Sequence, residues 1–186
     1  MNFVFIYKSW INIIPTLRGG VKVFIYKSIR RDVTFGRRLR IKRNTEWKLF
    51  PGCSFSAGSN VVIGKDVTIN VAPNANLKIG NNVGIGNRCQ IVSHKRIDIG
   101  EGTVIAPGVM IFDHNHVYDK EGGVKQREFY DGEVVIGRNS WIGAGSIILK
   151  NVHIGDNCVI GAGSVVTKDI PSGTVAVGVP AIVIKQ

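Results

Sequence analysis

The sequence has little of what defines several large classes of protein. Three cysteines at irregular spacing, among 186 residues, exclude a disulfide framework and a zinc finger. No apolar run reaches the roughly 18 residues that a transmembrane helix needs. Charged residues make up 20% of the chain and apolar residues 44%, which is typical of a folded globular protein. The start lacks the small-residue cleavage site of a signal peptide, so we expect a cytoplasmic protein.

Acidic residues are nearly absent from the first 50 positions. This segment holds 12 Lys and Arg against two acidic residues, and so carries +10 of the net charge of +11. Apolar residues recur at helical spacing over 11–31 with basic residues among them, which predicts one or two amphipathic helices. We therefore expect residues 1–50 to form a basic segment that binds the inner face of a membrane rather than nucleic acid. The alternative is that it packs on the end of the following domain and covers unpaired strand edges.

A six-residue repeat fills the C-terminal part of the chain. From Ile136 onward every sixth residue is aliphatic, and the fifth residue of each hexapeptide is small or aliphatic. IGRNS returns as IGDNC after 18 residues, and IGAGS returns unchanged after the same interval, so three hexapeptides make one turn. Gly and Asn at the corners tolerate the positive φ that tight turns require. The pattern predicts a triangular prism of stacked 18-residue coils with a short strand on each of three faces.

The repeat also predicts where the domain begins and where it is interrupted. It extends upstream to residue 79 and in degenerate form to 61–72, which predicts about six coils in a domain spanning 51–186. Between Ile111 and Ile136 lie 25 positions where the repeat requires six, so a long loop leaves one corner within 113–134. Long loops on a rigid scaffold commonly carry functional groups.

These hexapeptides, with the tail IGAGSVVTKDIPSGTVAVGVPAIVIKQ, resemble the hexapeptide-repeat, left-handed β-helix acyltransferases. DHNH at 113–116, followed by VVIGRNSWIGAGSIIL, is similar to the branch that acetylates sugars of exopolysaccharides and capsules, related to the maltose and galactoside acetyltransferases. The resemblance implies an all-β, left-handed parallel β-helix, acetyl-CoA as co-substrate without a metal, and a homotrimer with active sites between neighbouring prisms. It implies an O-acetyltransferase of surface-polysaccharide synthesis, whose acceptor is a sugar, a nucleotide sugar or a lipid-linked oligosaccharide.

Acetyl transfer to a hydroxyl needs a general base, and histidine suits this role because its pKa lies near neutrality. His114 stands where the long loop leaves the prism, and it matches the histidine that the family uses as base. We expect Asp113, His116 and Trp141 to contact the substrate or the loop. Asp113 is a candidate for fixing the imidazole tautomer, although neighbouring side chains usually point apart. Two of the three cysteines fall at inward positions, which favours direct transfer over an acyl-enzyme.

The resemblance also implies an acetyl-CoA site. The backbone N–H of Ala144 matches the group that holds the thioester carbonyl in the family. The other implied positions are Gly143, Ala162, Thr167, Lys168 and Lys185. Where sugar acetyltransferases often place two arginines against the nucleotide phosphates, this sequence has Ile182 and Lys185, so one phosphate contact is absent.

Three other functions stay open. An antibiotic acetyltransferase shares the histidine loop. A γ-carbonic-anhydrase-like enzyme would hold zinc with His94, His114 and His116, although the last two are closer in sequence than that family requires. A non-catalytic trimeric scaffold would have no use for the long loop.

Overall fold

The computed structural model describes residues 19–185, and every structural statement below concerns these residues. The part of the basic segment before residue 19, with the start of its predicted helices, lies outside them. Within the described range one helix, α2 (Gly19–Ile29), is followed by short strands. No helix in this range has the length and apolar character needed to cross a bilayer.

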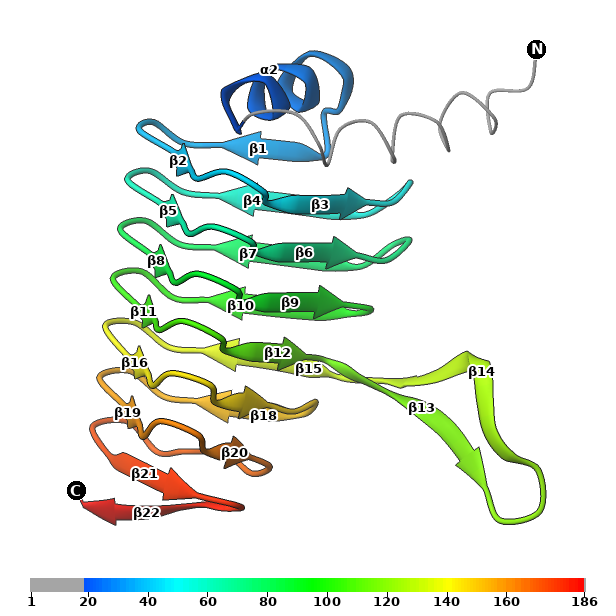
Figure 1. Cartoon of the computed structure of the whole chain (residues 1–186), viewed down its shortest axis with the longest axis vertical. Helices are drawn as coiled ribbons and strands as arrows, with labels where there is room; N and C mark the ends of the chain where they lie inside the picture. Colours follow the sequence, from blue (N-terminus) through cyan, green and yellow to red (C-terminus); the bar gives the residue numbers. More distant parts are fainter. Residues whose placement is uncertain (1–18, 186) are drawn as a thin grey trace.

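Three parallel sheets form the faces of a prism (Figure 1). Sheet A contains β1 (Val33–Phe35), β4 (Ser54–Ala57), β7 (Asn76–Ile79), β10 (Arg96–Ile99), β15 (Glu133–Ile136) and β18 (Val152–Ile154). Sheet B contains β2 (Arg40–Ile41), β5 (Val62–Ile63), β8 (Gly84–Ile85), β11 (Val104–Ile105), β16 (Trp141–Ile142), β19 (Val159–Ile160), β21 (Val175–Gly178) and β22 (Ala181–Lys185). Sheet C contains β3 (Glu46–Leu49), β6 (Thr68–Val71), β9 (Gln90–Ser93), β12 (Met110–Phe112), β17 (Ile147–Ile148) and β20 (Val165–Val166). Each coil supplies one strand to each face, which confirms the prediction of an all-β, left-handed parallel β-helix.

Six complete coils stack, and β21 begins a seventh that β22 ends by turning back antiparallel. The predicted period of 18 residues holds only for the last coils, where Val134 pairs with Val152. In the first coils the step is 22 residues, since Val33 pairs with Phe55 and Phe55 with Leu77. The added length lies partly in the strands: sheet C has four residues in β3 and two in β17.

The β-helix begins at Val33, one coil before the boundary predicted at residue 51. Strands β1 to β3 pair in register with β4 to β6, so residues 33–49 are a complete first coil rather than part of a separate basic segment. Arg38 and Asn44 occupy its corners with φ of 57° and 59°. A corner arginine does not match the Gly and Asn pattern of the repeat, which is why the sequence alone did not reveal this coil.

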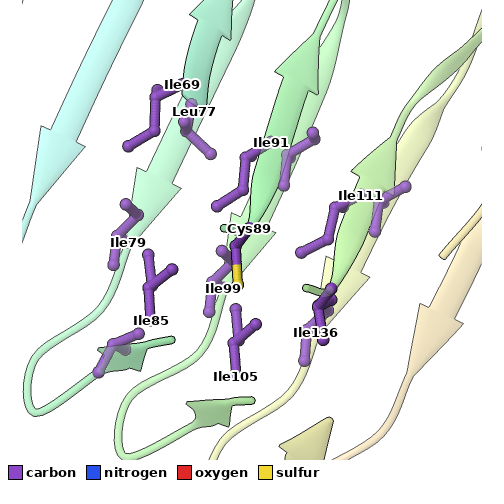
Figure 2. Packing of buried hydrophobic residues seen from close by; sticks show 14 of the residues in the cluster. Ile69, Leu77, Ile79, Ile85, Cys89, Ile91, Ile99, Ile105, Ile111 and Ile136 are labelled. Carbon is purple, nitrogen blue, oxygen red and sulfur yellow. The ribbon is translucent and has the colours of Figure 1, made fainter. Parts of the chain in front are cut away.

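Aliphatic side chains stack in columns inside the prism. Ile69, Ile91 and Ile111 follow one another in register along sheet C, and Figure 2 shows them in line. Ile99 and Ile136 form a second such column on sheet A. All five are buried, and burying each one stabilises the fold by about 1.5–3 kcal/mol relative to leaving it in water.

Helix α2 covers the open N-terminal end of the prism (Figure 1). Tyr26 is 4% exposed, and its ring centroid lies 6.1 Å from that of the buried Trp47. Arg30, just after the helix, pairs with Asp32 and donates hydrogen bonds of 3.1 Å to the carbonyl oxygens of Leu49 and Phe50. For the described part of the basic segment, packing on the end of the domain is therefore the interpretation that the structure bears out.

The predicted long loop is a β-hairpin. Strands β13 (His114–Asp119) and β14 (Gly123–Asp131) pair antiparallel and project from the prism between the fourth and fifth coils (Figure 1). The hairpin leaves from the corner where sheet C passes to sheet A, which we call the C–A corner. His114 pairs with Asp131 and His116 with Phe129, so the hairpin base carries both histidines and an aromatic ring.

Candidate active site

A buried carboxylate lies where the hairpin leaves the prism. Asp113 directly follows β12, and its side chain is completely buried. Its Oδ1 accepts a hydrogen bond from the backbone N–H of His94 at 2.7 Å. Its Oδ2 accepts from the Ser93 hydroxyl at 2.8 Å and from the backbone N–H groups of Lys95 at 2.9 Å and Arg96 at 2.8 Å. These donors hold the carboxylate in one orientation.

His114 contacts this carboxylate although the two residues are adjacent. Its Nδ1 lies 3.4 Å from Asp113 Oδ1, and 13% of its side chain is exposed. Burial raises the pKa of the Asp113 carboxyl, but the hydrogen bonds from His114 and the surrounding donors outweigh burial and hold that pKa below its ordinary value. An ionised carboxylate beside Nδ1 favours the tautomer with the proton on Nδ1, which leaves the lone pair of Nε2 free to accept a proton.

His94 and Phe129 enclose His114, and sequence reasoning assigned neither of them to an acetyltransferase site. The His94 and His114 rings stack with centroids 3.6 Å apart and planes 9° apart, and Phe129 lies edge-on to both. Burial lowers the pKa of the His94 imidazole, and the His114 ring lowers it further, against the opposing effect of Asp131, whose Oδ1 lies 3.6 Å from His94 Nδ1. A neutral ring is therefore stacked on the candidate base. His94 stands at the end of the third coil where His114 stands at the end of the fourth, since Val92 pairs with Phe112, and this equivalence is the sequence signal for the contact.

Two predicted contact residues lie on exposed surfaces. His116 is exposed, and its ring centroid lies 4.6 Å from that of Phe129 at the hairpin base. Trp141 points outward from sheet B and is 54% exposed. It is paired in register with Val104, which is 50% exposed, and with Val159. Trp141 thus belongs to an apolar row on one face of the prism, and its predicted contact with the substrate or the loop stays a prediction.

Ala144 presents a backbone N–H that no acceptor within residues 19–185 engages. It lies on the corner where sheet B passes to sheet C, the B–C corner. At Lys65, the matching corner position three coils earlier, the N–H donates at 2.8 Å to Oδ1 of Asn87 in the next coil. Beneath Ala144 the next coil supplies Ala162, which has no side-chain oxygen. The IGAGS repeat therefore leaves a free, exposed donor at this corner.

The other predicted acetyl-CoA residues are divided between two corners and sheet B. Gly143 approaches the next coil so closely that an added Cβ would lie 2.5 Å from the Ala162 nitrogen, so coil stacking itself requires this glycine. Thr167 and Lys168 are exposed and follow β20 at the C–A corner. Lys185 ends β22, in register with Val175 of sheet B.

One chain does not bring His114 and Ala144 together. His114 lies at the C–A corner, whereas Ala144 lies at the B–C corner of the next coil. Between them face C runs through β17, and the five residue steps from Ala144 to Leu149 span roughly 15 Å.

The histidines do not converge as metal ligands. His94 and His114 stack face to face, so their ring nitrogens do not point at a common centre. In residues 19–185 no three His, Cys, Asp or Glu side chains are grouped so that they could share a metal ion.

Comparison with known proteins places this architecture. The family described as bacterial transferase hexapeptide (six repeats) matches residues 133–168. The putative lipopolysaccharide biosynthesis O-acetyl transferase WbbJ of Escherichia coli (strain K12) is 33% identical over 141 residues, which cover 72% of this chain and 72% of that protein. The chain belongs to the hexapeptide-repeat transferase family. A solved galactoside acetyltransferase in complex with coenzyme A is 30% identical, with a TM-score of 0.59 over 97% of this chain and 78% of that one.

Other members of the hexapeptide-repeat family match a shorter part of the chain more strongly. Nodulation protein L of Rhizobium leguminosarum bv. viciae is 50% identical over 107 residues, 57% of this chain and 55% of that protein. The chain spans 55%, 57% and 59% of the length of three such curated relatives. The resemblance to the hexapeptide-repeat family is confirmed, and the alignments with these three relatives cover little more than half of each.

Proposed function

We propose that the protein transfers the acetyl group of acetyl-CoA to a hydroxyl group of a sugar, by direct transfer, in the synthesis of a surface polysaccharide. The observation that carries the proposal is the His114 imidazole, held through Nδ1 by the buried Asp113 carboxylate at the base of the hairpin. Relatives support it: one family member was solved with coenzyme A, and another is named for O-acetyl transfer in lipopolysaccharide biosynthesis.

In the proposed reaction Nε2 of His114 takes the proton of the acceptor hydroxyl while the hydroxyl oxygen attacks the thioester carbonyl carbon. The carbonyl oxygen gains negative charge and accepts a hydrogen bond from the N–H of Ala144. The carbon–sulfur bond then breaks, and the proton on Nε2 passes to the leaving thiolate, so that the acetyl ester and CoA thiol are released and the histidine is neutral again. The Asp113 carboxylate stabilises the imidazolium that forms between these steps.

An acyl-enzyme on cysteine has no support in this chain. All three cysteines are buried. Burial raises the pKa of the Cys53 and Cys89 thiols, which disfavours the nucleophilic thiolate.

The test is release of free thiol from acetyl-CoA across a panel of sugars, with wild-type protein and His114→Ala. Loss of a general base lowers kcat by roughly 10²–10⁴-fold, while CoA affinity changes little. His153→Ala is the matched control, since His153 is an exposed histidine on β18, away from the hairpin. If His114→Ala keeps more than about a tenth of the wild-type kcat, the assignment of the base is wrong.

The proposed site lies between two chains of a homotrimer, because His114 and Ala144 are on different corners of one prism. Mixing two inactive variants tests this arrangement. Ala144→Pro removes the donor N–H at a position where the preceding coil already has proline, Pro107. In randomly mixed trimers of Ala144→Pro and His114→Ala about a quarter of the sites combine a wild-type His114 with a wild-type Ala144. We expect about that share of wild-type activity, whereas a site within one chain would give none.

Peripheral contact with a membrane is proposed for the N-terminal end of the prism. Helix α2 exposes three apolar side chains there, Val21 (47%), Phe24 (72%) and Ile29 (61%). Exposed Arg31 and Arg37 lie close by in the sequence, and basic residues near an anionic surface add about 1 kcal/mol each.

A further inference from the structure

Four basic residues form a row along the upper part of the B–C corner. Lys42 and Arg43 lie in the first coil, Lys65 in the second and Arg88 in the third; we call them the basic ladder. Backbone hydrogen bonds join the turns of this corner, from the Asp66 N–H to the Arg43 carbonyl oxygen and from the Arg88 N–H to the Lys65 carbonyl oxygen at 2.8 Å.

The backbone hydrogen bonds that join the turns of this corner continue from the ladder to Ala144. The N–H of Gly108 donates to Asn87 O at 2.9 Å, and the N–H of Gly145 donates to Pro107 O at 3.0 Å. Ala144 therefore follows Asn87 and Pro107 on one continuous edge. With coils about 4.8 Å apart, Arg88 lies roughly 10 Å and Lys65 roughly 14 Å along the edge from Ala144.

The cations of the ladder are exposed and unpaired, which is typical of a surface that binds an anion rather than of a network of stabilising ion pairs. All four side chains are exposed, and no carboxylate in residues 19–185 lies within ion-pair distance of any of them. Asp66 is the one acidic residue at the corner positions of these coils, so the corner carries a net charge of +3. Cations of one sign in a row repel one another, which disfavours the fold unless an anion binds them.

The other two corners of the same coils carry no such row. The corner from sheet A to sheet B has Arg37 and Arg38 in the first coil, then Ser59, Asn60 and Asn81 in the next two. At the C–A corner the cation of the third coil, Lys95, is paired with Glu133 at 3.2 Å. A row of unpaired cations that runs over three coils is thus found, within residues 19–185, only on the edge that leads to the free N–H of Ala144.

We infer that the acceptor is a sugar phosphate or diphosphate ester, whose phosphate binds Lys65 and Arg88 while its sugar hydroxyl reaches the site at Ala144 and His114. This inference rests on the proposed acetyl transfer. A neutral sugar needs no cations, whereas guanidinium and ammonium groups are the usual partners of phosphate oxygens. The phosphate chemistry is shared by two sources, a nucleoside diphosphate sugar and a sugar on a polyprenyl phosphate carrier.

A binding experiment tests the ladder independently of acetyl transfer. Uridine diphosphate is titrated calorimetrically into the full-length protein without acetyl-CoA, and vesicles of phosphatidylcholine with or without polyprenyl phosphate are sedimented with it. The variant is Lys65→Gln with Arg88→Gln. Its control is Lys78→Gln with Lys120→Gln, which removes two lysines that are exposed and unpaired within residues 19–185 and lie away from the ladder.

We expect the ladder variant to weaken binding of the phosphate probe at least about tenfold and the control to change it less than about twofold. Binding of the soluble diphosphate alone assigns a nucleotide sugar, and binding of the polyprenyl phosphate vesicles alone assigns a lipid-linked one. If neither probe binds, or if the control loses as much as the ladder variant, the inference is overturned.

Turnover separates this inference from the proposed function. With acetyl-CoA and paired acceptors, a hexose and its 1-phosphate, the ladder variant should lose kcat/KM for the phosphate about tenfold and keep it for the free hexose. Loss of turnover in His114→Ala with no effect of the ladder variant would leave acetyl transfer standing and overturn the phosphate acceptor. Ladder-dependent phosphate binding without any acetyl transfer would overturn the proposed function instead.

Discussion

An asparagine in place of Ala162 should accept a hydrogen bond from the backbone N–H of Ala144 without disturbing the fold. The precedent is in the molecule itself: Asn87 occupies the same corner position in the third coil, and its Oδ1 accepts the N–H of Lys65 at 2.8 Å. An asparagine introduced at this position would stand beneath Ala144 in the same way, since Gly163 donates to the Ala144 carbonyl oxygen at 2.8 Å as Arg88 does to that of Lys65.

The magnitude follows from what one hydrogen bond contributes in each state. Removing a single oxyanion donor lowers kcat by about 10²–10³-fold. The new bond from the Ala144 N–H to Oδ1 of the introduced asparagine is expected to raise the free energy of unfolding by about 0.5–1.5 kcal/mol. Catalysis and stability should therefore change in opposite directions, which a general disruption of the coil would not produce.

The assay pairs kcat from thiol release with urea unfolding of the same preparation. Ala162→Leu is the matched control, because leucine has the shape of asparagine but no acceptor, and its effect measures steric obstruction alone. The asparagine variant should be the slower and the more stable of the two. If both variants have equal kcat, or if asparagine lowers stability as much as leucine, the Ala144 N–H is not the donor we propose.

Three further predictions concern the buried charges and the N-terminal end. Asp113→Asn should lower the free energy of unfolding, measured by urea titration, by about 2–6 kcal/mol. The NH₂ group of the asparagine must face at least one backbone N–H that the carboxylate accepted, so both of these donors lose their acceptor. A loss below about 1 kcal/mol, or an equal loss in the exposed control Asp131→Asn, would contradict this. The His94 pKa is lowered in the folded state, so the unfolded state binds the extra proton and stability falls as pH drops below about 6.5; unfolding measured between pH 7 and 5 should show a flatter dependence in His94→Gln. A chain that begins at Arg31 lacks Tyr26 and Arg30 at the end of the prism, so it should have a lower melting temperature or precipitate. It should also lose its salt-sensitive sedimentation with anionic vesicles. An unchanged melting temperature would show that α2 does not cover the core.

The repeat predicted the prism because its information is local. A corner every six residues and like residues every 18 fix both the strands and their stacking, and the hairpin followed as an interruption of that count. The same counting could not place the first coil, whose residues pair with partners 22 positions away and whose corners carry Arg37, Arg38, Lys42 and Arg43. Those cations suggested a separate basic segment, whereas in the structure they are the corners of a coil.

Only those parts of the candidate site that follow from the position of one residue in the sequence could be predicted. His114 could be found because it opens the insertion. Its stacking on His94 depends on two coils meeting at one corner, and the contact with Asp113 depends on a change of chain direction between neighbouring residues. The repeat aligns His94 with His114 on neighbouring coils, but spacing along the chain does not show that the two rings stack or that Asp113 contacts its neighbour.

The two alanines of the IGAGS repeats illustrate a different kind of sequence signal. Their glycines attract attention because they turn corners, and Gly145 does have a φ of 67°. Yet the proposed stabilisation of the oxyanion depends on the side-chain oxygen that Ala162 lacks. At other corners a side-chain oxygen of the next coil accepts the N–H, as Asn87 and Asp156 do for Lys65 and Arg138 at 2.8 Å and 2.6 Å. Where Ala162 provides none, an exposed donor is left on a rigid edge, already oriented and with no reorganisation to make before it binds a negatively charged oxygen.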